Sequence, residues 1–184
     1  MTRMMIARAN VNWAPEPARG PWPGGSDTEP QNLLVSTGAA PATDLHAAVE
    51  QMLQAVPWHQ ERIEQLQYVA ADSTAWLLQQ TSDLLRTGGW VRGAYERGGG
   101  YCLTGALTEA AKRLGVAWEV KRAGELALEL SLALRTRGMD VNLIRYNDHL
   151  GRRVEQVQEL LATATQIAYR YGQPVVAAPK STPA

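Results

Sequence analysis

The stretch GELALELSLALRTRG, residues 124–138, decides the fold class of this chain. Leucine occupies every second position from 126 to 134, and such alternation is typical of a β-strand. The residues between the leucines are Ala, Glu and Ser rather than β-branched or aromatic types, and Leu, Ala and Glu are strong helix formers. We therefore predict a helix here. Because this helix is apolar on most sides, we place it at the centre of the domain.

Helical patterns lie on both sides of this central segment. Apolar residues at helical spacing predict further helices over residues 44–56, 60–69, 73–87, 103–114 and 152–171. Capping residues support the boundaries, since Thr43-Asp44 precedes the first helix, Pro57 ends it and Gly115 closes the fourth. These patterns predict a mostly α fold, a compact bundle of five to six helices over residues 43–171 with a Gly-rich loop.

Two expectations concern details of this bundle. Tyr68 and Trp76 are placed among the inward-facing side chains, Trp76 together with the leucines that follow it. Residues 141–146 are expected to form a short extended link before the last helix.

Both ends of the chain have a composition that does not favour regular structure. Residues 1–42 carry six of the ten prolines, which predicts a disordered Pro/Gly-rich arm. Residues 172–184 predict a second disordered end. Trp13 and Trp22 stand out in the arm, because disordered segments are usually poor in aromatic residues. They either pack back on the helical domain or anchor a partner.

Composition argues against several classes of function. The 184 residues carry 18 basic and 18 acidic side chains, so no overall field favours nucleic acid or anionic lipid. A single cysteine excludes an intramolecular disulfide and fits a reducing compartment. No apolar run approaches the roughly 20 residues that span a bilayer, and residues 1–13 lack the apolar core of a signal peptide. We expect a cytoplasmic protein without a membrane or nucleic-acid partner.

The most unusual segment is GGWVRGAYERGGGYCLTGAL, residues 88–107. It holds seven of the sixteen glycines and the only cysteine, which indicates tight turns or a close approach between backbone segments. We place a contact surface here, with a second one in the arm. The candidate binding residues are Trp13, Trp22, Trp90, Arg92, Tyr95, Tyr101, Cys102, Asn147 and Asp148.

Cys102 is the one candidate nucleophile. At the start of a helix, the dipole and the free amide groups lower the pKa of a thiol and can stabilise an oxyanion. His149 is the favoured base, because Asp148 is adjacent and could help to orient it. The competing interpretation is that Cys102 is a small buried residue at a helix start.

Other chemistry has little support in the sequence. The Gly-rich loop lacks the Gly-Lys-Ser/Thr ending of a phosphate-binding loop, although Arg92 and Arg97 could face an anion. Three dispersed histidines and one cysteine offer no metal-ligand spacing, so no metal or other cofactor is predicted. We expect Asn147 or Asp148 to cap the last helix.

The motifs of the chain resemble those of an uncharacterised family of small proteins from actinobacteria and their phages. The pattern GGW…CxxGA(L/I)…(W/Y)ND..GR is carried here by Gly88-Gly89-Trp90, Gly93-Ala94-Tyr95, Cys102-Leu103-Thr104-Gly105-Ala106-Leu107, Tyr146-Asn147-Asp148 and Gly151-Arg152. The resemblance covers about residues 70–165 and implies no known activity. The family has Ala-Pro where this chain has His149-Leu150, which weakens a Cys-His pair as shared chemistry. The resemblance implies that Asn147 and Asp148 form a structural turn beside the Gly-rich loop.

These observations predict a non-enzymatic binding or regulatory protein whose partner is another protein. If the gene is phage-borne, the partner is a host protein. The alternative is a cysteine-dependent hydrolase or transferase that uses Cys102 with His149. A third class is a small-ligand or anion binder at the Gly-rich loop.

Overall fold

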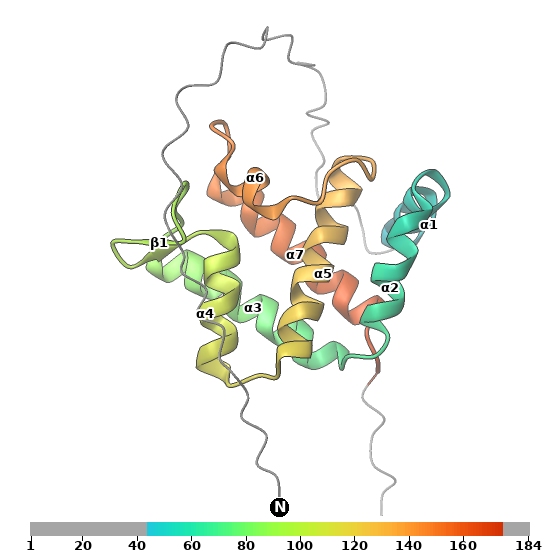
Figure 1. The fold of residues 1–184 in the computed structure, drawn as a ribbon, viewed down its shortest axis with the longest axis horizontal. Helices are drawn as coiled ribbons and strands as arrows, with labels where there is room; N and C mark the ends of the chain where they lie inside the picture. The colour runs from blue at the N-terminus through green and yellow to red at the C-terminus, as the bar shows by residue number, and fades with distance from the viewer. Residues whose placement is uncertain (1–43, 175–184) are drawn as a thin grey trace, which may run out of the picture. The chain divides into compact units, whose positions relative to one another are not determined.

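The computed structural model describes residues 44–174 and confirms the mostly α prediction (Figure 1). The predicted arm with Trp13 and Trp22, like residues 175–184, lies outside the described residues. The elements of the described part are α1 (Asp44–Ala55), the 3-10 helix η1 (Pro57–His59), α2 (Gln60–Leu66), α3 (Ala71–Gly88), β1 (Glu96–Arg97), β2 (Gly100–Tyr101), α4 (Leu103–Leu114), α5 (Trp118–Arg135), α6 (Leu143–Asp148) and α7 (Val154–Tyr171). Within this range, no helix is long and apolar enough to cross a membrane.

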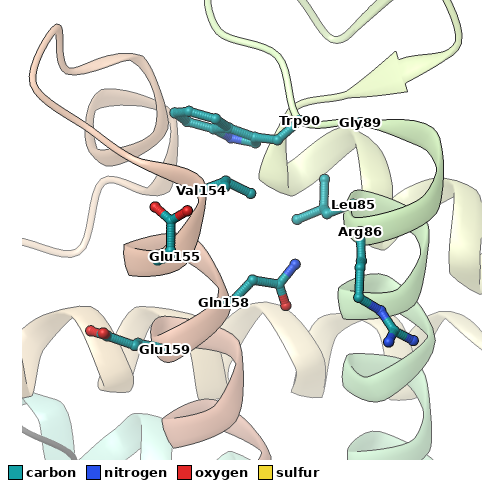
Figure 2. Close-up of a pocket in the computed structure, with 8 residues that line it drawn as sticks. All are labelled: Leu85, Arg86, Gly89, Trp90, Val154, Glu155, Gln158 and Glu159. Carbon is teal, nitrogen blue, oxygen red and sulfur yellow. The ribbon is translucent and has the colours of Figure 1, made fainter.

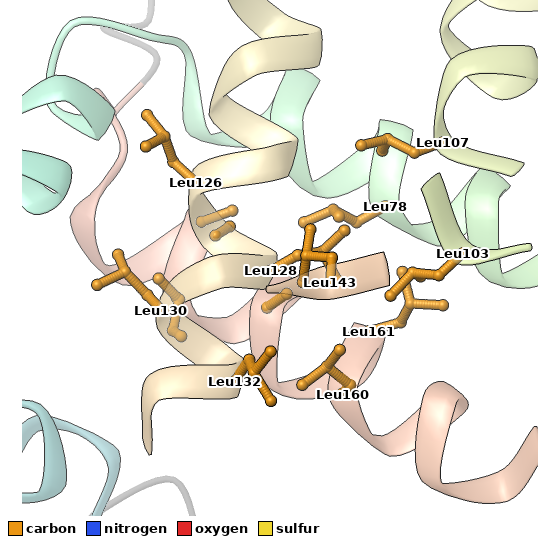
Figure 3. Close-up of a cluster of buried hydrophobic side chains, with 14 of the residues drawn as sticks. Leu78, Leu103, Leu107, Leu126, Leu128, Leu130, Leu132, Leu143, Leu160 and Leu161 are labelled. Carbon is orange, nitrogen blue, oxygen red and sulfur yellow. The ribbon is translucent and has the colours of Figure 1, made fainter. Parts of the chain in front are cut away.

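Helix α5 lies at the centre and is buried on opposite sides, as predicted. Successive residues of an α-helix are separated by 100°, so residues two apart point about 200° from one another. Leu126 and Leu130 therefore project toward α1 and α2, whereas Leu128 and Leu132 lie with the leucines of α3, α4 and α7 (Figure 3). None of these four side chains is more than 2% exposed. The alternation that resembles a strand thus results from a helix that is covered on two sides.

Helices α3 and α7 form an antiparallel pair that packs against α5 (Figure 1). The Ser82 hydroxyl donates to the side chain of Gln158, and Ala71 near the start of α3 contacts Gly172 just after α7. Beyond the helix, Ala71 N donates to Gln173 O at 2.9 Å and Gln173 N donates to Val69 O at 2.8 Å. Backbone hydrogen bonds therefore join Gln173, two residues beyond the end of α7, to the start of α3.

The expected extended link over residues 141–146 is wrong, because Leu143–Asp148 forms the short helix α6. The Asn142 side chain caps this helix by accepting a hydrogen bond from Arg145 N at 2.8 Å. Leu143, Tyr146 and Asn147 are buried at i, i+3 and i+4. A helix of six residues is too short to show its period in the sequence.

The inward placement of Tyr68 and Trp76 is also wrong, since these side chains are 84% and 49% exposed. Helix α2 ends at Leu66. Tyr68 therefore lies beyond the helix and does not continue the row of buried side chains on it. On α3 the buried positions include the small residues Thr74 and Thr81, which permit close helix packing. The larger indole of Trp76 lies on the outer side.

A buried histidine joins the N-terminal helices to the connection after α5. His59 is fully buried, and its Nε2 donates to the Gly138 carbonyl at 3.1 Å. Gly138 has a φ of +83°, and a Cβ there would lie 2.5 Å from a methyl group of Val56. The other ring nitrogen, Nδ1, is buried with no hydrogen-bond partner among the described residues. A proton added to Nδ1 would therefore have no acceptor.

The position of His59 predicts that the protein is less stable at mildly acidic pH. Burial lowers the pKa of His59 below its ordinary value of 6.5, and the hydrogen bond to Gly138 opposes this shift only in part. As the pH falls through that ordinary value, the unfolded state binds a proton that the native state does not, so the free energy of unfolding decreases. The decrease stops below the lowered native pKa. Urea unfolding between about pH 7.5 and 5.5 measures it.

The substitution His59→Gln isolates this contribution, because its amide can still donate to Gly138 and does not titrate. We expect a smaller pH dependence in H59Q than in the wild type. In the control His149→Gln, which changes an exposed histidine, the wild-type contribution of His59 is retained. An unchanged pH dependence in H59Q would contradict the assignment.

Candidate functional site

The side chain of Asn147, near the end of α6, joins the Gly-rich loop to the start of α4. Its Oδ1 accepts hydrogen bonds from Trp90 Nε1 at 2.7 Å and from Leu103 N at 3.0 Å. Its Nδ2 donates to Val91 O at 3.1 Å and to Asp148 Oδ1 at 2.7 Å. Asn147 is 2% exposed, and these four bonds satisfy its amide. In the opposite orientation, the NH2 group would face the donors of Trp90 and Leu103, and the oxygen would face the acceptors of Val91 and Asp148. Only the observed orientation of the amide therefore satisfies all four partners.

The glycines of the loop form a tight hairpin that lies against α4. Strand β1 pairs antiparallel with β2, and Gly98 and Gly99 between them have φ values of +60° and +85°. Two successive residues with positive φ are typical of a type I′ turn, which favours glycine. A Cβ on Gly105 would lie 2.4 Å from Tyr95 O, and one on Gly100 would lie 2.9 Å from Gly89 O. The predicted tight turn and close backbone approach are both confirmed.

A second set of contacts ties the loop to the residues after Asn147. Asp148 Oδ1 accepts a hydrogen bond from Gly93 N at 2.9 Å. This bond is the main cause that lowers the pKa of the Asp148 carboxyl, and the hydrogen bond from the Asn147 side chain is the second cause. The Arg92 guanidinium donates to the carbonyls of His149 and Leu150. The predicted packing of Asn147 and Asp148 beside the Gly-rich loop is therefore confirmed, but the two residues lie in helix α6 rather than in a turn.

The expectation that Asn147 or Asp148 caps the last helix is wrong. The N-cap of α7 is Arg153, whose backbone N–H donates to the Gln156 side chain at 3.0 Å. Asn147 and Asp148 lie in α6 and direct their side chains to the loop instead. A short link separates Asp148, at the end of α6, from Arg153, the N-cap of α7. The predicted elements did not include α6, so the expectation placed Asn147 and Asp148 directly before the last helix.

Cys102 is the N-cap of α4 and is 9% exposed. Its Sγ accepts a hydrogen bond from Gly105 N at 3.3 Å and lies 3.4 Å from Thr104 Oγ1. His149 is exposed, and its Nδ1 accepts a hydrogen bond from Gly151 N at 3.2 Å. Among the described residues, no hydrogen bond joins Cys102 to a histidine. The structure thus places Cys102 in a helix cap.

The other predicted binding residues of the loop differ in their exposure. Trp90 is half-buried, whereas Arg92 and Tyr95 are exposed. Tyr101, which lies in β2 of the hairpin itself, is buried. Trp90 is therefore the predicted aromatic residue that is both held by the fold and open to its surroundings.

Within residues 44–174, no cluster of three His, Cys, Asp or Glu side chains is arranged to hold a metal ion.

A groove of about 670 Å³ opens beside Trp90, between the end of α3 and the start of α7 (Figure 2). We call it the Trp90 groove. It is lined by Leu85, Arg86, Gly89, Trp90, Val154, Glu155, Gln158 and Glu159. The indole lies across one end, while Val154 and Leu85 face each other below it (Figure 2). A volume in this range is typical of binding sites in proteins.

The charged residues of the Trp90 groove differ in their ion pairing. Arg86 pairs with Asp83 on its own helix at 2.7 Å, and Glu159 pairs with Arg135 at 3.3 Å. Glu155 has no ion pair within the described range. The groove thus combines an apolar floor with an unpaired carboxylate at its rim.

Sequence reasoning identified Trp90 but missed the rest of this groove. Leu85 and Val154 are ordinary apolar positions of the helices predicted over residues 73–87 and 152–171, and Glu155 and Glu159 have the spacing of an ordinary solvated helix face. The residues come from segments almost 70 positions apart. No local signal links them, because the groove exists only where α3 and α7 are packed together.

We expect Asn147→Ala to lower the free energy of unfolding by about 2–3 kcal/mol, because it removes four hydrogen bonds and leaves buried groups without partners. The matched control is Asn142→Ala, which removes the exposed N-cap of α6 and should cost about 1 kcal/mol. Urea unfolding of the two variants provides the comparison. Equal losses would show that the buried amide has no special role in stability.

Comparison with known proteins identifies a family for this chain. A family described as of unknown function, DUF6197, matches residues 69–167, just over half of the chain. No curated protein and no solved structure matches. The matched region begins just before α3 and ends within α7, so it contains the Gly-rich loop, Asn147 and the whole Trp90 groove. The chain therefore belongs to the DUF6197 family of unknown function.

Proposed function

We propose that this protein is a non-enzymatic binding protein that contacts a protein partner through the Trp90 groove. The observation that carries the proposal is the fixed indole: Trp90 Nε1 donates to Asn147 Oδ1 at 2.7 Å while the ring borders an open groove. Aromatic side chains that are already held in place lose little conformational freedom on binding, and they are enriched among the residues that dominate interface energies. Beneath the ring, the half-buried Val154 adds apolar surface, and the buried Leu85 closes the floor of the groove.

The hydrogen bonds of the neighbouring polar residues support binding over catalysis. Asn147 and Asp148 direct their side chains into the fold, and Cys102 Sγ faces the first turn of α4. A cysteine-dependent hydrolase or transferase would need a base within hydrogen-bond reach of the thiol. The third class, an anion binder at the loop, has less support because Arg92 already donates to two backbone carbonyls.

The finer parts of the proposal rest on the sequence. A single cysteine fits a reducing compartment, which favours action in the cytoplasm. The motif resemblance to proteins of actinobacteria and their phages favours a bacterial protein as the partner, and a host protein if the gene is phage-borne. Trp13 and Trp22 are proposed as a second contact, and they lie outside the described residues.

The substitution Val154→Gln tests the Trp90 groove as the contact surface. It places a polar amide on the apolar floor, and it should weaken binding of a partner by about tenfold. The matched control Ala162→Gln introduces the same side chain at an exposed position of α7, away from the groove. We expect A162Q to bind like the wild type.

The measurement has two stages. Proteins of a bacterial extract that are retained by the full chain are identified, and their binding is then measured with purified components by calorimetry. Retention of no specific protein would contradict the proposal. A partner that binds V154Q and the wild type equally would also contradict it.

The reactivity of Cys102 separates the proposal from the hydrolase alternative. Because the thiol is 9% exposed and faces Gly105 N, we expect slow alkylation by iodoacetamide in the folded protein at neutral pH. His149→Ala should leave the rate unchanged. A fast reaction that slows in H149A would favour the enzyme instead.

A further inference from the structure

We infer that the Trp90 groove binds a protein segment in which an apolar side chain lies close to a lysine or arginine. This inference rests on the proposed function, because it names the chemistry of the partner at the same groove. It combines the apolar floor of the groove with the unpaired carboxylate of Glu155 at its rim.

The carboxylates of the groove lie on one side. Glu155 and Glu159 are one turn apart on α7, and both project from that helix, whereas Arg86 projects from α3 on the other side (Figure 2). Arg86 and Glu159 are each neutralised by a partner, Asp83 and Arg135 respectively. The remaining charge among the groove residues is that of Glu155. A cation at this rim would gain a partner, and an anion would be repelled.

The surroundings of Glu155 favour a long cationic side chain. Lysine and arginine place an aliphatic stem on apolar surface while the charged end reaches a polar rim. Val154 and Trp90 supply that surface next to the carboxylate (Figure 2), and the face of an indole attracts cations. Arg92 also lies near the Trp90 ring, at 5.7 Å, but its guanidinium donates to the backbone of the α6–α7 connection.

The polar groups of the groove fit a peptide segment better than a small metabolite. A small-molecule site needs several convergent polar groups that fix the orientation of the ligand. Here the side-chain amide of Gln158 is occupied, since it exchanges hydrogen bonds with the hydroxyl and carbonyl of Ser82. The side chains of Arg86 and Glu159 are occupied by ion pairs. The apolar floor of the groove and the Glu155 carboxylate remain free. A peptide with an apolar side chain and a neighbouring cation would contact both.

Selection from a library of random peptides tests the inference on the full chain. We expect the wild type to select peptides in which Lys or Arg lies near a large apolar residue. The substitution Glu155→Lys should reverse the preference and select Asp or Glu at that place. The control Glu64→Lys makes the same charge change at an exposed position of α2, outside the groove, and it should keep the wild-type preference.

A milder variant keeps the test valid if E155K is poorly folded, because Glu155 lies in the first turn of α7, where an acidic residue favours the helix. We expect Glu155→Gln to bind a selected basic peptide about two- to fivefold more weakly, the range of an exposed ion pair. E155Q and the wild type should bind the same peptide equally well when norleucine replaces its lysine, because the uncharged norleucine makes no ion pair with Glu155.

The outcomes separate the inference from the proposed function. Peptides that bind the wild type but not V154Q, yet show no preference for basic residues, would overturn the inference and leave the binding groove in place. A selection of acidic peptides by the wild type would do the same. Selection of peptides that bind V154Q and the wild type equally would overturn both.

Discussion

The buried amide of Asn147 is the interaction on which the candidate site depends. One side chain accepts from the Trp90 indole and the Leu103 backbone, and it donates to Val91. It thereby connects three segments: the end of α6, the Gly-rich loop and the start of α4. A residue with fewer hydrogen-bonding groups could not satisfy all of them, and each buried group left unpaired would cost free energy. The orientation of Trp90 over its groove follows from this arrangement.

The glycines of the loop serve the same arrangement by letting backbone approach backbone. Gly105 allows the Tyr95 carbonyl to lie against the first turn of α4, and Gly98 and Gly99 permit the turn of the hairpin. These are structural uses of glycine. Cys102 fits the same description, because its Sγ accepts a hydrogen bond from Gly105 N in the helix cap. The loop thus presents Trp90 to the groove.

The helical scaffold around the site consists of helices inside the region shared with the family and helices outside it. Helices α3, α4, α5 and α7 lie within or largely within the region shared with the family, whereas α1, η1 and α2 lie outside it. Yet α5 projects Leu126 and Leu130 toward α1 and α2 (Figure 3). Burying a leucine contributes about 1.5–3 kcal/mol, so the N-terminal helices of this chain have a direct part in stabilising the shared core. The buried His59 adds a contact between η1 and the connection after α5.

The sequence by itself determined the helical class and the central position of residues 124–138, because both follow from local propensity. Its glycine content also indicated the tight turn within the Gly-rich loop. The tertiary structure decided the rest. The short helix α6 depends on the cap at Asn142 and on burial that its six residues do not reveal by period. The outward position of Trp76 depends on how closely its helix packs against its neighbours. The Trp90 groove joins residues of α3 and α7 that are distant in the chain. Its shape arises from helix packing, and a sequence pattern within one segment carries no information about which distant segment will lie beside it.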